Sequence, residues 1–374
     1  MAGEAARSSA DAIVIGGGIV GVAAAAHIAA AGLRVTLVEQ TEIAAGASGR
    51  NSGVVQHPFD PVLVALHLET LALYRGLDGF SIPDRPAGLL NVTRDVDGAR
   101  RLTEARQATH PQLKPEFLGP DDVRRLEPAL APGVAASRLD IGYPVAPAAA
   151  TMAYAALARA NGVEIRLGVG AGPWRSDGRV LGAELADGER IAAADVIVAA
   201  GPWSPAVIDP SGAWRPIRPI WGVVVPLGLA DPPGHVIEEA EISIEPDAES
   251  DGAGIAFSLV TADGATSLGS TFLEAEPKAD ALVPVLIERG ARFVPAIAGA
   301  QHGPPRRCAR PQSADGRPLL GPVPGNDGLW IAAGHGPWGI STGPASGRII
   351  ADLVTGRLGG PPRALDPARF GLPI

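Results

Sequence analysis

The chain has 374 residues, enough for two domains with substantial cores, and its 46% apolar content indicates a folded globular protein. The net charge is −9, from 31 basic and 40 acidic residues, and the sequence contains no long basic run. Both observations argue against nucleic acid and anionic membrane surfaces as partners. A single cysteine, Cys308, excludes an intrachain disulfide and a cysteine-based zinc site, and we expect no metal. The first ten residues lack the basic start and apolar core of a secretion signal. We therefore expect a cytoplasmic protein, without an integral membrane segment, that acts on a small molecule.

The first predicted elements are a strand over 12–15, a helix over 20–31 and a second strand over 33–38. The whole run is apolar enough to cross a membrane, but three glycines interrupt it directly after the first strand, where a membrane helix has no use for them. The order of strand, glycine turn, helix and strand is instead that of a βαβ unit.

The glycines Gly16, Gly18 and Gly21 have the spacing G-x-G-x-x-G, and Glu39 follows the last of them by 18 positions. The first glycine permits the tight turn, the second lets the backbone approach a pyrophosphate, and the third lets the helix pack closely on the strand. The helix N-terminus then offers free N–H groups to the phosphates. Glu39 is placed to accept hydrogen bonds from ribose hydroxyls and would repel a ribose phosphate, which disfavours NADP. The unit predicts a bound dinucleotide.

The remaining helices and strands alternate as far as residue 216, an antiparallel sheet follows, and a strand and a helix then end the chain. Following a small-residue loop over 41–57, we expect helices over 61–77, 99–108, 121–126 and 146–161, and strands over 89–93, 163–167, 180–185, 190–194 and 196–199. Between 217 and 293 the pattern changes to an antiparallel sheet with one helix near 279–290, and the chain closes with a strand from 329 and a helix over 343–355.

This order predicts an α/β protein with a discontinuous Rossmann-type nucleotide-binding domain and an antiparallel-sheet substrate domain. We place the nucleotide-binding domain at 1–80, 145–215 and 306–374, and the substrate domain at 81–144 and 216–305.

Four separated segments resemble the FAD-dependent oxidoreductases typified by D-amino acid oxidase, glycine oxidase and sarcosine oxidase. They are "VIGGGIVG" with Glu39, "GASGRNSG" at 46–53, "VIVAAGPWS" at 196–204, and "ARPQSADGRPLLGPVP" with "AAGHGPWGIS" near the end. The resemblance implies bound FAD and oxidation of the C–N bond of a small amino acid or N-substituted amino acid by hydride transfer to flavin N5, giving an imine that water hydrolyses.

The resemblance also implies positions that contact FAD. For the pyrophosphate and ribose they are Gly16, Gly17, Gly18, Ile19, Val20, Gly21, Glu39 and Gln40; for the diphosphate and flavin ring, Ala47, Ser48, Asn51, Ser52 and Val54; for adenine, Val169; on the middle strand, Gly201 and Trp203; and at the pyrimidine end of the flavin, Gly334, His335, Gly336, Trp338, Gly339 and Ile340. Backbone amides in the last group would stabilise negative charge on reduced flavin.

Two residues near the C-terminus carry further expectations. Arg310 opens "RPQSADG", which is similar to the glycine oxidase motif whose arginine pairs with the substrate carboxylate, and a planar guanidinium suits that role. A structural salt bridge is the alternative. Cys308 stands where monomeric sarcosine oxidase attaches its flavin. The resemblance therefore suggests a thioether bond between the Cys308 sulfur and FAD, and the alternative is an inert buried thiol.

The resemblance leaves substrate and acceptor open. His57, Trp221 and Trp338 are candidates for the pocket wall, each with a structural role as the alternative. Ser267 stands where sarcosine oxidase has a lysine that promotes reaction with oxygen, so the acceptor is oxygen or another molecule. The alternatives to amine oxidation are a 2-hydroxy acid dehydrogenase and a flavin-carrying subunit of a larger complex, and a homo-oligomer is also compatible with the sequence.

Overall fold

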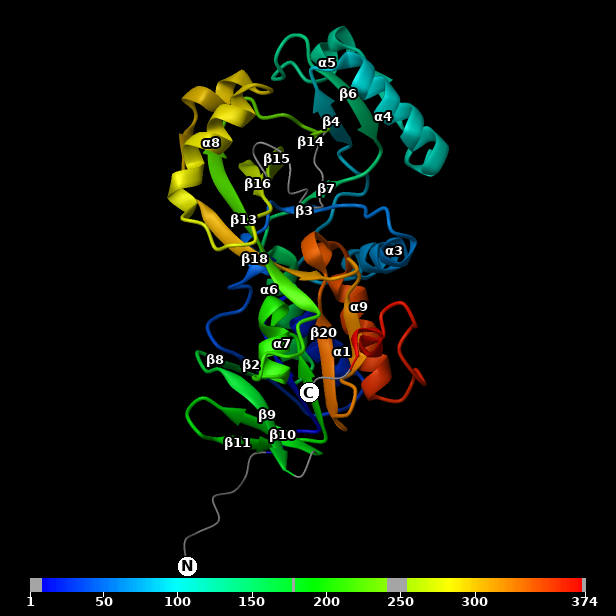
Figure 1. The fold of residues 1–374 in the computed structure, drawn as a ribbon, viewed down its shortest axis with the longest axis vertical. Helices are drawn as coiled ribbons and strands as arrows, with labels where there is room; N and C mark the ends of the chain where they lie inside the picture. Colours follow the sequence, from blue (N-terminus) through cyan, green and yellow to red (C-terminus); the bar gives the residue numbers. More distant parts are fainter. Residues whose placement is uncertain (1–8, 177–178, 241–253, 372–374) are drawn as a thin grey trace, which may run out of the picture.

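A six-stranded sheet forms the centre of the lower lobe of the computed structural model, which describes residues 9–176, 179–240 and 254–371 (Figure 1). Its strand order is β19-β20-β12-β1-β2-β8, and every neighbouring pair is parallel except β19 with β20. The strands are β1 (Ala12–Ile15), β2 (Val35–Glu39), β8 (Glu164–Leu167), β12 (Asp195–Val198), β19 (Leu319–Pro322) and β20 (Leu329–Ala333). The predicted βαβ unit and the predicted return of the chain to this sheet are confirmed.

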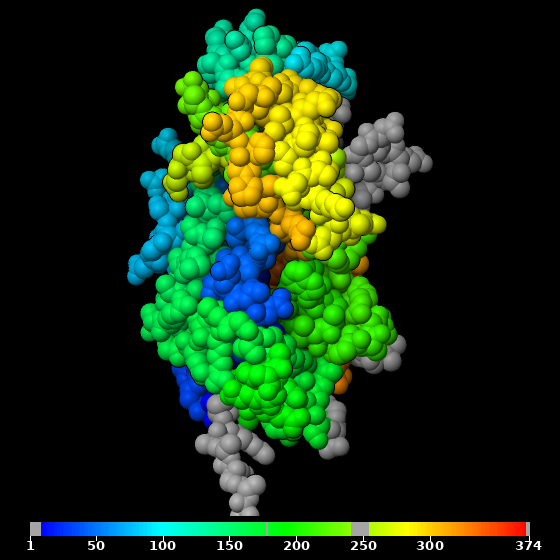
Figure 2. Space-filling model, turned by 90° about the vertical axis from the view of Figure 1, so that its left-hand side faces the viewer, coloured from blue at the N-terminus to red at the C-terminus, as the bar shows by residue number. Residues whose placement is uncertain are grey.

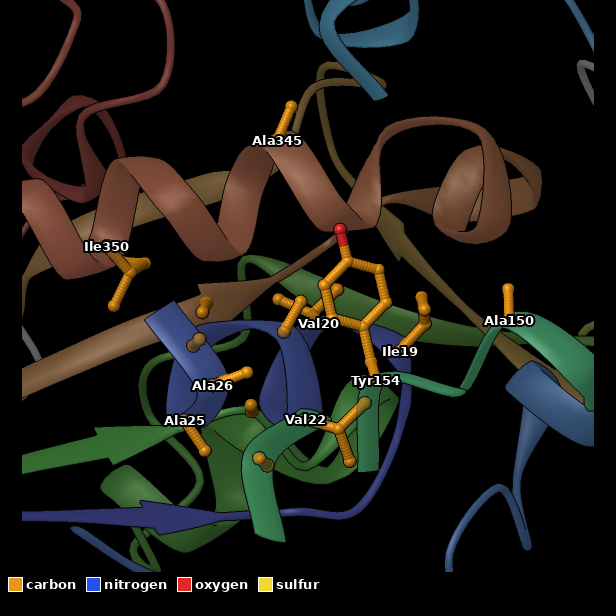
Figure 3. Close-up of a cluster of buried hydrophobic side chains, with 14 of the residues drawn as sticks. Ile19, Val20, Val22, Ala25, Ala26, Ala150, Tyr154, Ala345 and Ile350 are labelled. Atoms are coloured by element: carbon orange, nitrogen blue, oxygen red, sulfur yellow. The ribbon is translucent and has the colours of Figure 1, made fainter. Parts of the chain in front are cut away.

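The helix α1 (Ile19–Ala30) is buried between α6 (Ala149–Ala160) and α9 (Gly339–Val354). Figure 3 shows its small apolar side chains between Tyr154 of α6 and the α9 residues Ala345 and Ile350. Small residues allow a close crossing: a Cβ on Gly347 would lie 2.6 Å from the backbone nitrogen of Ala24. The helices α1 and α9, from opposite ends of the chain, therefore pack almost backbone to backbone.

The predicted start of the last helix at 343 is wrong, because α9 begins at Gly339. Pro344 lies inside the helix and cannot donate to the carbonyl of Ile340, which is why the sequence suggests a later start. That carbonyl instead accepts a hydrogen bond of 2.7 Å from the buried hydroxyl of Tyr74 in α3 (Pro61–Arg75). A side chain from another helix thus replaces the bond that proline removes.

A nine-stranded sheet forms the upper lobe, with helices α4 (Val96–Thr109), α5 (Pro120–Leu126) and α8 (Ala279–Ala291) packed against it (Figure 1). Its main path is β17-β13-β16-β15-β14-β4-β6-β5, with β18 paired to β13. The strands are β4 (Leu89–Thr93), β5 (Glu116–Leu118), β6 (Ala135–Leu139), β13 (Ile217–Gly228), β14 (Val236–Glu239), β15 (Ile255–Ala262), β16 (Ala265–Thr271), β17 (Gln301–His302) and β18 (Arg306–Ser313). The sheet is antiparallel, as predicted, except for the parallel pair of β4 and β14.

Smaller elements complete the two lobes. The predicted hairpin of β10 (Arg179–Leu185) and β11 (Arg190–Ala192) is confirmed, and β9 (Ala171–Ser176) extends it. The sequence did not predict β9, β5, β6, or the pair of β3 (Val54–Val55) with β7 (Tyr143–Pro144). Short helical turns follow the strands of the lower lobe: α2 (Ala47–Arg50), η2 (Gly201–Trp203), α7 (Ser204–Ile208) and η4 (Gly336–Trp338), while η1 (Pro111–Leu113), η3 (Pro295–Gly299) and η5 (Pro367–Phe370) lie elsewhere.

The strands β13 and β18 link the lobes, because they pair with each other over 217–224 and 306–313 while the far end of β13 pairs with β16. The predicted boundary between 305 and 306 would separate these partners, and the division into domains stays a prediction. Within the described residues, no helix combines the length and the apolar character that crossing a bilayer requires.

Candidate active site

A cavity of about 550 Å³ runs from the glycine turn of the lower lobe to the face of the nine-stranded sheet. Its lower part is lined by the loops at the carboxyl ends of β1, β2, β12 and β20, which is where ligands bind in open parallel sheets. Its upper part is lined by residues of β14, β15, β16 and β18. In Figure 2 the blue segment near residues 40–60 lies at mid-height beside a hollow in the surface, between green residues below and yellow and orange ones above.

The glycine corner has no room for side chains at two of its three predicted positions. Gly16 has φ +121°, and a Cβ there would lie 2.4 Å from the carbonyl oxygen of Ala199. A Cβ on Gly21 would lie 2.0 Å from the oxygen of Gly16, so any side chain would force α1 away from β1. Gly18 is the N-cap of α1, whose first turn holds no acidic residue. The positive end of the helix dipole therefore faces the cavity with no acidic side chain of α1 itself beside it.

Two side chains meet this corner, one from the end of β2 and one from the segment that follows it. The carboxylate of Glu39 accepts hydrogen bonds from the N–H groups of Gly17 at 2.7 Å and Thr41 at 2.9 Å, which fixes it at the cavity rim. The hydroxyl of Ser48 accepts a bond of 3.0 Å from the N–H of Ile19, the first residue of α1. Both contacts show polar groups gathered at the helix N-terminus, as a phosphate site requires.

The loop over 46–57 is held in shape by Asn51. Its amide donates to the carbonyls of Ala47 and Ser48, at 3.1 and 2.9 Å, and its carbonyl accepts from the N–H of Gly53 at 2.8 Å. This bonding leaves backbone atoms of the loop exposed along the cavity, where all five predicted positions lie: Ala47, Ser48, Asn51, Ser52 and Val54. Asn51 thus organises the loop in addition to lining the cavity.

The N-terminus of α9 forms a second helix end at the cavity. Gly336, at φ +55°, turns the chain into η4, and α9 follows with no acidic residue in its first turn. Gly336, Trp338, Gly339 and Ile340 line the cavity. His335 is 1% exposed, contacts the hydroxyl of Ser346 at 2.9 Å, and has its pKa lowered to about 3 by burial, so it is neutral. The amides and the helix dipole, rather than a charged side chain, supply positive potential here.

Arg310 lies in the upper part of the cavity, on β18. One terminal nitrogen donates to the carbonyl of Thr271 at 2.7 Å and the other to the hydroxyl of Ser270 at 2.6 Å, and the guanidinium stacks on Phe272 at 4.5 Å. Burial lowers the pKa of Arg310, and among the described residues no carboxylate forms an ion pair with it. The guanidinium keeps free N–H donors, and its charge lacks an anion.

Cys308 lies two residues earlier on the same strand and also lines the cavity. It is 5% exposed, and burial raises the pKa of its thiol although Arg310, Arg50 and Arg306 act in the opposite direction. The thiol is therefore neutral at pH 7, which does not favour it as a nucleophile.

His57 lies at the end of the loop over 46–57, lines the cavity, and has no partner for its Nδ1 atom in the described structure. Its ring packs edge-on against His67, with centroids 5.1 Å apart. Burial lowers the pKa of both rings, to about 4 for His67. Both are neutral bases at pH 7.

Not every predicted position reaches the cavity. Gly17, Gly21, Val169, Gly334 and Trp221 are absent from its lining, although Val169 directly precedes the lining residues Gly170 and Ala171. The remaining predicted positions line it: Gly16, Gly18, Ile19, Val20, Glu39, Gln40, Gly201, Trp203, Cys308, His335 and those named above. Trp221 hydrogen-bonds Leu273 through its backbone and faces away from Arg310, because its neighbour Gly222 faces the guanidinium.

Two cavity residues that sequence reasoning missed are Gln56 and Glu238. Glu238 is the third residue of β14, and its carboxylate accepts from the amide of Gln56 at 3.4 Å. Two adjacent glutamates in a short strand are a signal that the sequence held, but only the fold brings Glu238 to the cavity that Arg310 lines.

Ser267 stands at the position where sarcosine oxidase has a lysine, and in this chain an arginine side chain contacts it. Arg306 of β18 donates to the hydroxyl of Ser267 at 2.9 Å and to the carbonyl of Asn51 at 3.2 Å. The positive charge comes from a neighbouring strand.

The βαβ glycine corner, the acidic residue ending β2 and the cavity that continues to a second sheet define a two-lobed dinucleotide-binding oxidoreductase. The chain belongs to the DAO family of FAD dependent oxidoreductases, whose model matches residues 11–353. It is an FAD-dependent enzyme of that family. The residues present fit FAD, because two helix ends without acidic residues and a corner that excludes side chains border one cavity.

Individual relatives agree with this assignment. A glycine oxidase from Pseudomonas aeruginosa is 29% identical over 364 residues, covering 92% of this chain and 94% of that protein. A D-amino acid dehydrogenase from Xanthobacter autotrophicus is 30% identical over 304 residues, covering 77% and 68%. The crystal structure of a glycine oxidase from Geobacillus kaustophilus has a similar fold, with a TM-score of 0.80 at 24% identity and 98% of both chains covered.

Proposed function

We propose that the chain oxidises the C–N bond of a small amino acid or N-substituted amino acid. The observation that carries this proposal is Arg310, a half-buried guanidinium in the cavity whose only described hydrogen-bond partners are a carbonyl and a hydroxyl. A partly desolvated charge without a counter-ion is costly, and a ligand carboxylate would pair with it. The glycine oxidase and D-amino acid dehydrogenase relatives support an amino acid as the bearer of that carboxylate.

The chain's own groups have positioning roles in this reaction. Arg310 binds the carboxylate and fixes the α-carbon in the cavity, so that orientation lowers the barrier. FAD, when bound, would supply the acceptor for the hydride, which carries both electrons. The amides of Gly339 and Ile340 at the start of α9 offer positive potential to negative charge that develops beside them.

The remaining FAD contacts stay proposals of the same kind. We propose that the glycine corner and Ser48 hold the phosphates, that Glu39 holds the ribose, and that Val169 lies against adenine. Trp338 and His57, which line the cavity, remain proposed walls of the substrate site, whereas Trp221 does not line it. A thioether bond between Cys308 and FAD also stays a proposal. The position of Cys308 in the cavity permits it, whereas the neutral state of the thiol disfavours it.

A 2-hydroxy acid is a second candidate substrate, supported by His57. A hydroxyl must lose its proton when its carbon is oxidised, and the unpartnered Nδ1 of a neutral histidine in the cavity could accept that proton. Amine oxidation needs no such base once the amine is neutral.

The test is reduction of the purified FAD-loaded protein in the absence of oxygen. Amino acids, N-methyl amino acids and 2-hydroxy acids are added separately, and loss of flavin absorbance identifies the class. We expect bleaching by an amino acid, whereas bleaching by 2-hydroxy acids alone would refute amine oxidation. Reoxidation by oxygen or by a dye then identifies the acceptor.

The same preparation addresses the remaining proposals. Colour that stays with acid-precipitated chain would support the thioether, and gel filtration would show whether the protein is a monomer, a homo-oligomer or a subunit that copurifies with other chains. Fractionation of cells would test the proposed cytoplasmic location.

A further inference from the structure

The nine-stranded sheet places a carboxylate on the same cavity wall as Arg310. Ser270 of β16, which binds the guanidinium, follows Gly269, and Gly269 is opposite Ser258 of β15. Ser258 is in turn opposite Glu238 of β14. Ser270, Ser258, Glu238 and Arg310 all line the cavity. The carboxylate of Glu238 and the serine that binds the guanidinium therefore border the same space from two strands, β14 and β16, that are separated by β15 alone.

The spacing of the strands gives a length scale for a ligand that reaches both Ser270, the partner of Arg310, and Glu238. Two strand spacings of about 4.8 Å place the backbones of β16 and β14 roughly 10 Å apart. An amino acid that accepts from the guanidinium and donates to Glu238 spans about 9 Å, from two hydrogen bonds of about 2.8 Å and about 3 Å between its carboxylate oxygen and its nitrogen. A distal ammonium on a long side chain would need several ångströms more.

Glu238 has unused capacity to accept hydrogen bonds. Its one described partner is the amide of Gln56, at 3.4 Å, and burial raises the pKa of its carboxyl group. The adjacent Glu239 is different: it binds Arg289 at 2.7 and 3.0 Å and accepts from the N–H of Phe257. Since a carboxylate can accept about four hydrogen bonds, Glu238 can bind a cationic nitrogen in the cavity.

We propose that Glu238 binds the α-nitrogen of the substrate whose carboxylate Arg310 holds, so that the cavity selects zwitterions over simple carboxylates. This inference rests on the proposed function and extends it from carboxylate recognition to amine recognition. It also separates the two candidate substrates, since a 2-hydroxy acid carries no positive charge for Glu238.

The experiment compares ligands that differ only in the amino group. Glycine is compared with acetate, and L-alanine and D-alanine are each compared with propionate. Dissociation constants are measured on the FAD-loaded protein without oxygen, from flavin absorbance changes for the acids and from saturation of the reduction rate, or calorimetry, for the amino acids. The variant is Glu238→Gln, and Glu116→Gln on β5, an exposed carboxylate of the same sheet paired with Arg138, is the control.

We expect Glu238→Gln to weaken the best-bound amino acid about 10- to 100-fold, the loss typical of a charge-assisted hydrogen bond. Binding of acetate and propionate should be unchanged or tighter, and Glu116→Gln should alter neither. Equal weakening of acids and amino acids, or no change for amino acids, would overturn the proposal.

Measurements on the unaltered protein keep the proposal testable if the variant fails to fold. The best amino acid should bind at least 10-fold more tightly than its amine-free partner, and lysine should gain nothing over norleucine. Equal affinity within the pairs overturns the role of Glu238. If amino acids bind as expected but never reduce the flavin, the proposed oxidation fails while amine recognition stands.

Discussion

Arg310 offers a prediction in which binding and stability move in opposite directions. Replacing it with methionine keeps an unbranched side chain that can still pack on Phe272, where the guanidinium now lies 4.5 Å from the ring centroid. The change removes the charge and its hydrogen bonds to Thr271 and Ser270. Ligand carboxylates lose their partner, while the folded protein loses an uncompensated buried cation.

The magnitudes follow from those contacts. Truncating one partner of a buried charge pair costs about 2–5 kcal/mol, so the dissociation constant of an amino acid should rise by roughly 30-fold or more. In the ligand-free protein, two lost hydrogen bonds from a charged donor cost about 1.5–3 kcal/mol each. Removing the desolvation penalty of a half-buried cation without a counter-ion offsets a cost of that order. We expect Arg310→Met to unfold at the same temperature or higher.

The assay combines thermal unfolding without ligand and anaerobic titration with the best amino acid and with acetate. A melting temperature lowered by several degrees, together with unchanged carboxylate binding, would refute the reasoning and make Arg310 a structural residue. The variant Arg310→Lys separates charge from shape, because an ammonium keeps the charge but cannot form the planar two-point contact.

Three further predictions concern cofactor binding, acid stability and thiol reactivity. Gly21→Ala should lose most FAD, measured as the ratio of flavin to protein absorbance, because its Cβ would meet a backbone oxygen at 2.0 Å, whereas Gly359→Ala, with nothing within 4 Å, should keep it. Because the pKa of buried His67 falls to about 4, its contribution to stability is complete above about pH 6.5 and is lost as the pH falls towards 4, at up to about 1.4 kcal/mol per pH unit. A His67→Asn variant should therefore lose less unfolding free energy between pH 7 and 5 than the parent, with exposed His302→Asn as the control, and identical losses would contradict the assignment. Since burial raises the pKa of Cys308, iodoacetamide at pH 8 should label it only after unfolding, and rapid labelling of the native protein would count against a buried thiol.

The sequence predicted the parts of the fold that local chemistry dictates. The glycine spacing identified β1, α1 and β2 because each glycine meets a steric requirement inside that unit. By contrast, β9 contains Gly172 and Pro173, and it becomes a strand only because β10 lies beside it. The start of α9 was misplaced for a similar reason, since the hydroxyl of Tyr74 arrives from a distant helix.

The residues of the candidate site also fall into those that the sequence predicts and those that only the fold brings together. Motif positions could be read along the chain, and most of them line the cavity. Which face of a strand a residue occupies was not readable, so Trp221 was expected at the pocket wall although Gly222 is the residue that faces Arg310. Glu238 and Gln56 come together across 182 positions, a contact that no local pattern contains.

The close crossing of α1 and α9 has a consequence for biosynthesis. Ala24 leaves the ribosome long before Gly347, and at about 5–20 residues per second the interval is some tens of seconds. Throughout that time the alanine-rich surface of α1 has no partner on one side. Loading of the coenzyme is therefore expected only after translation has passed the final helix, and the nascent chain is a natural client for chaperones until then.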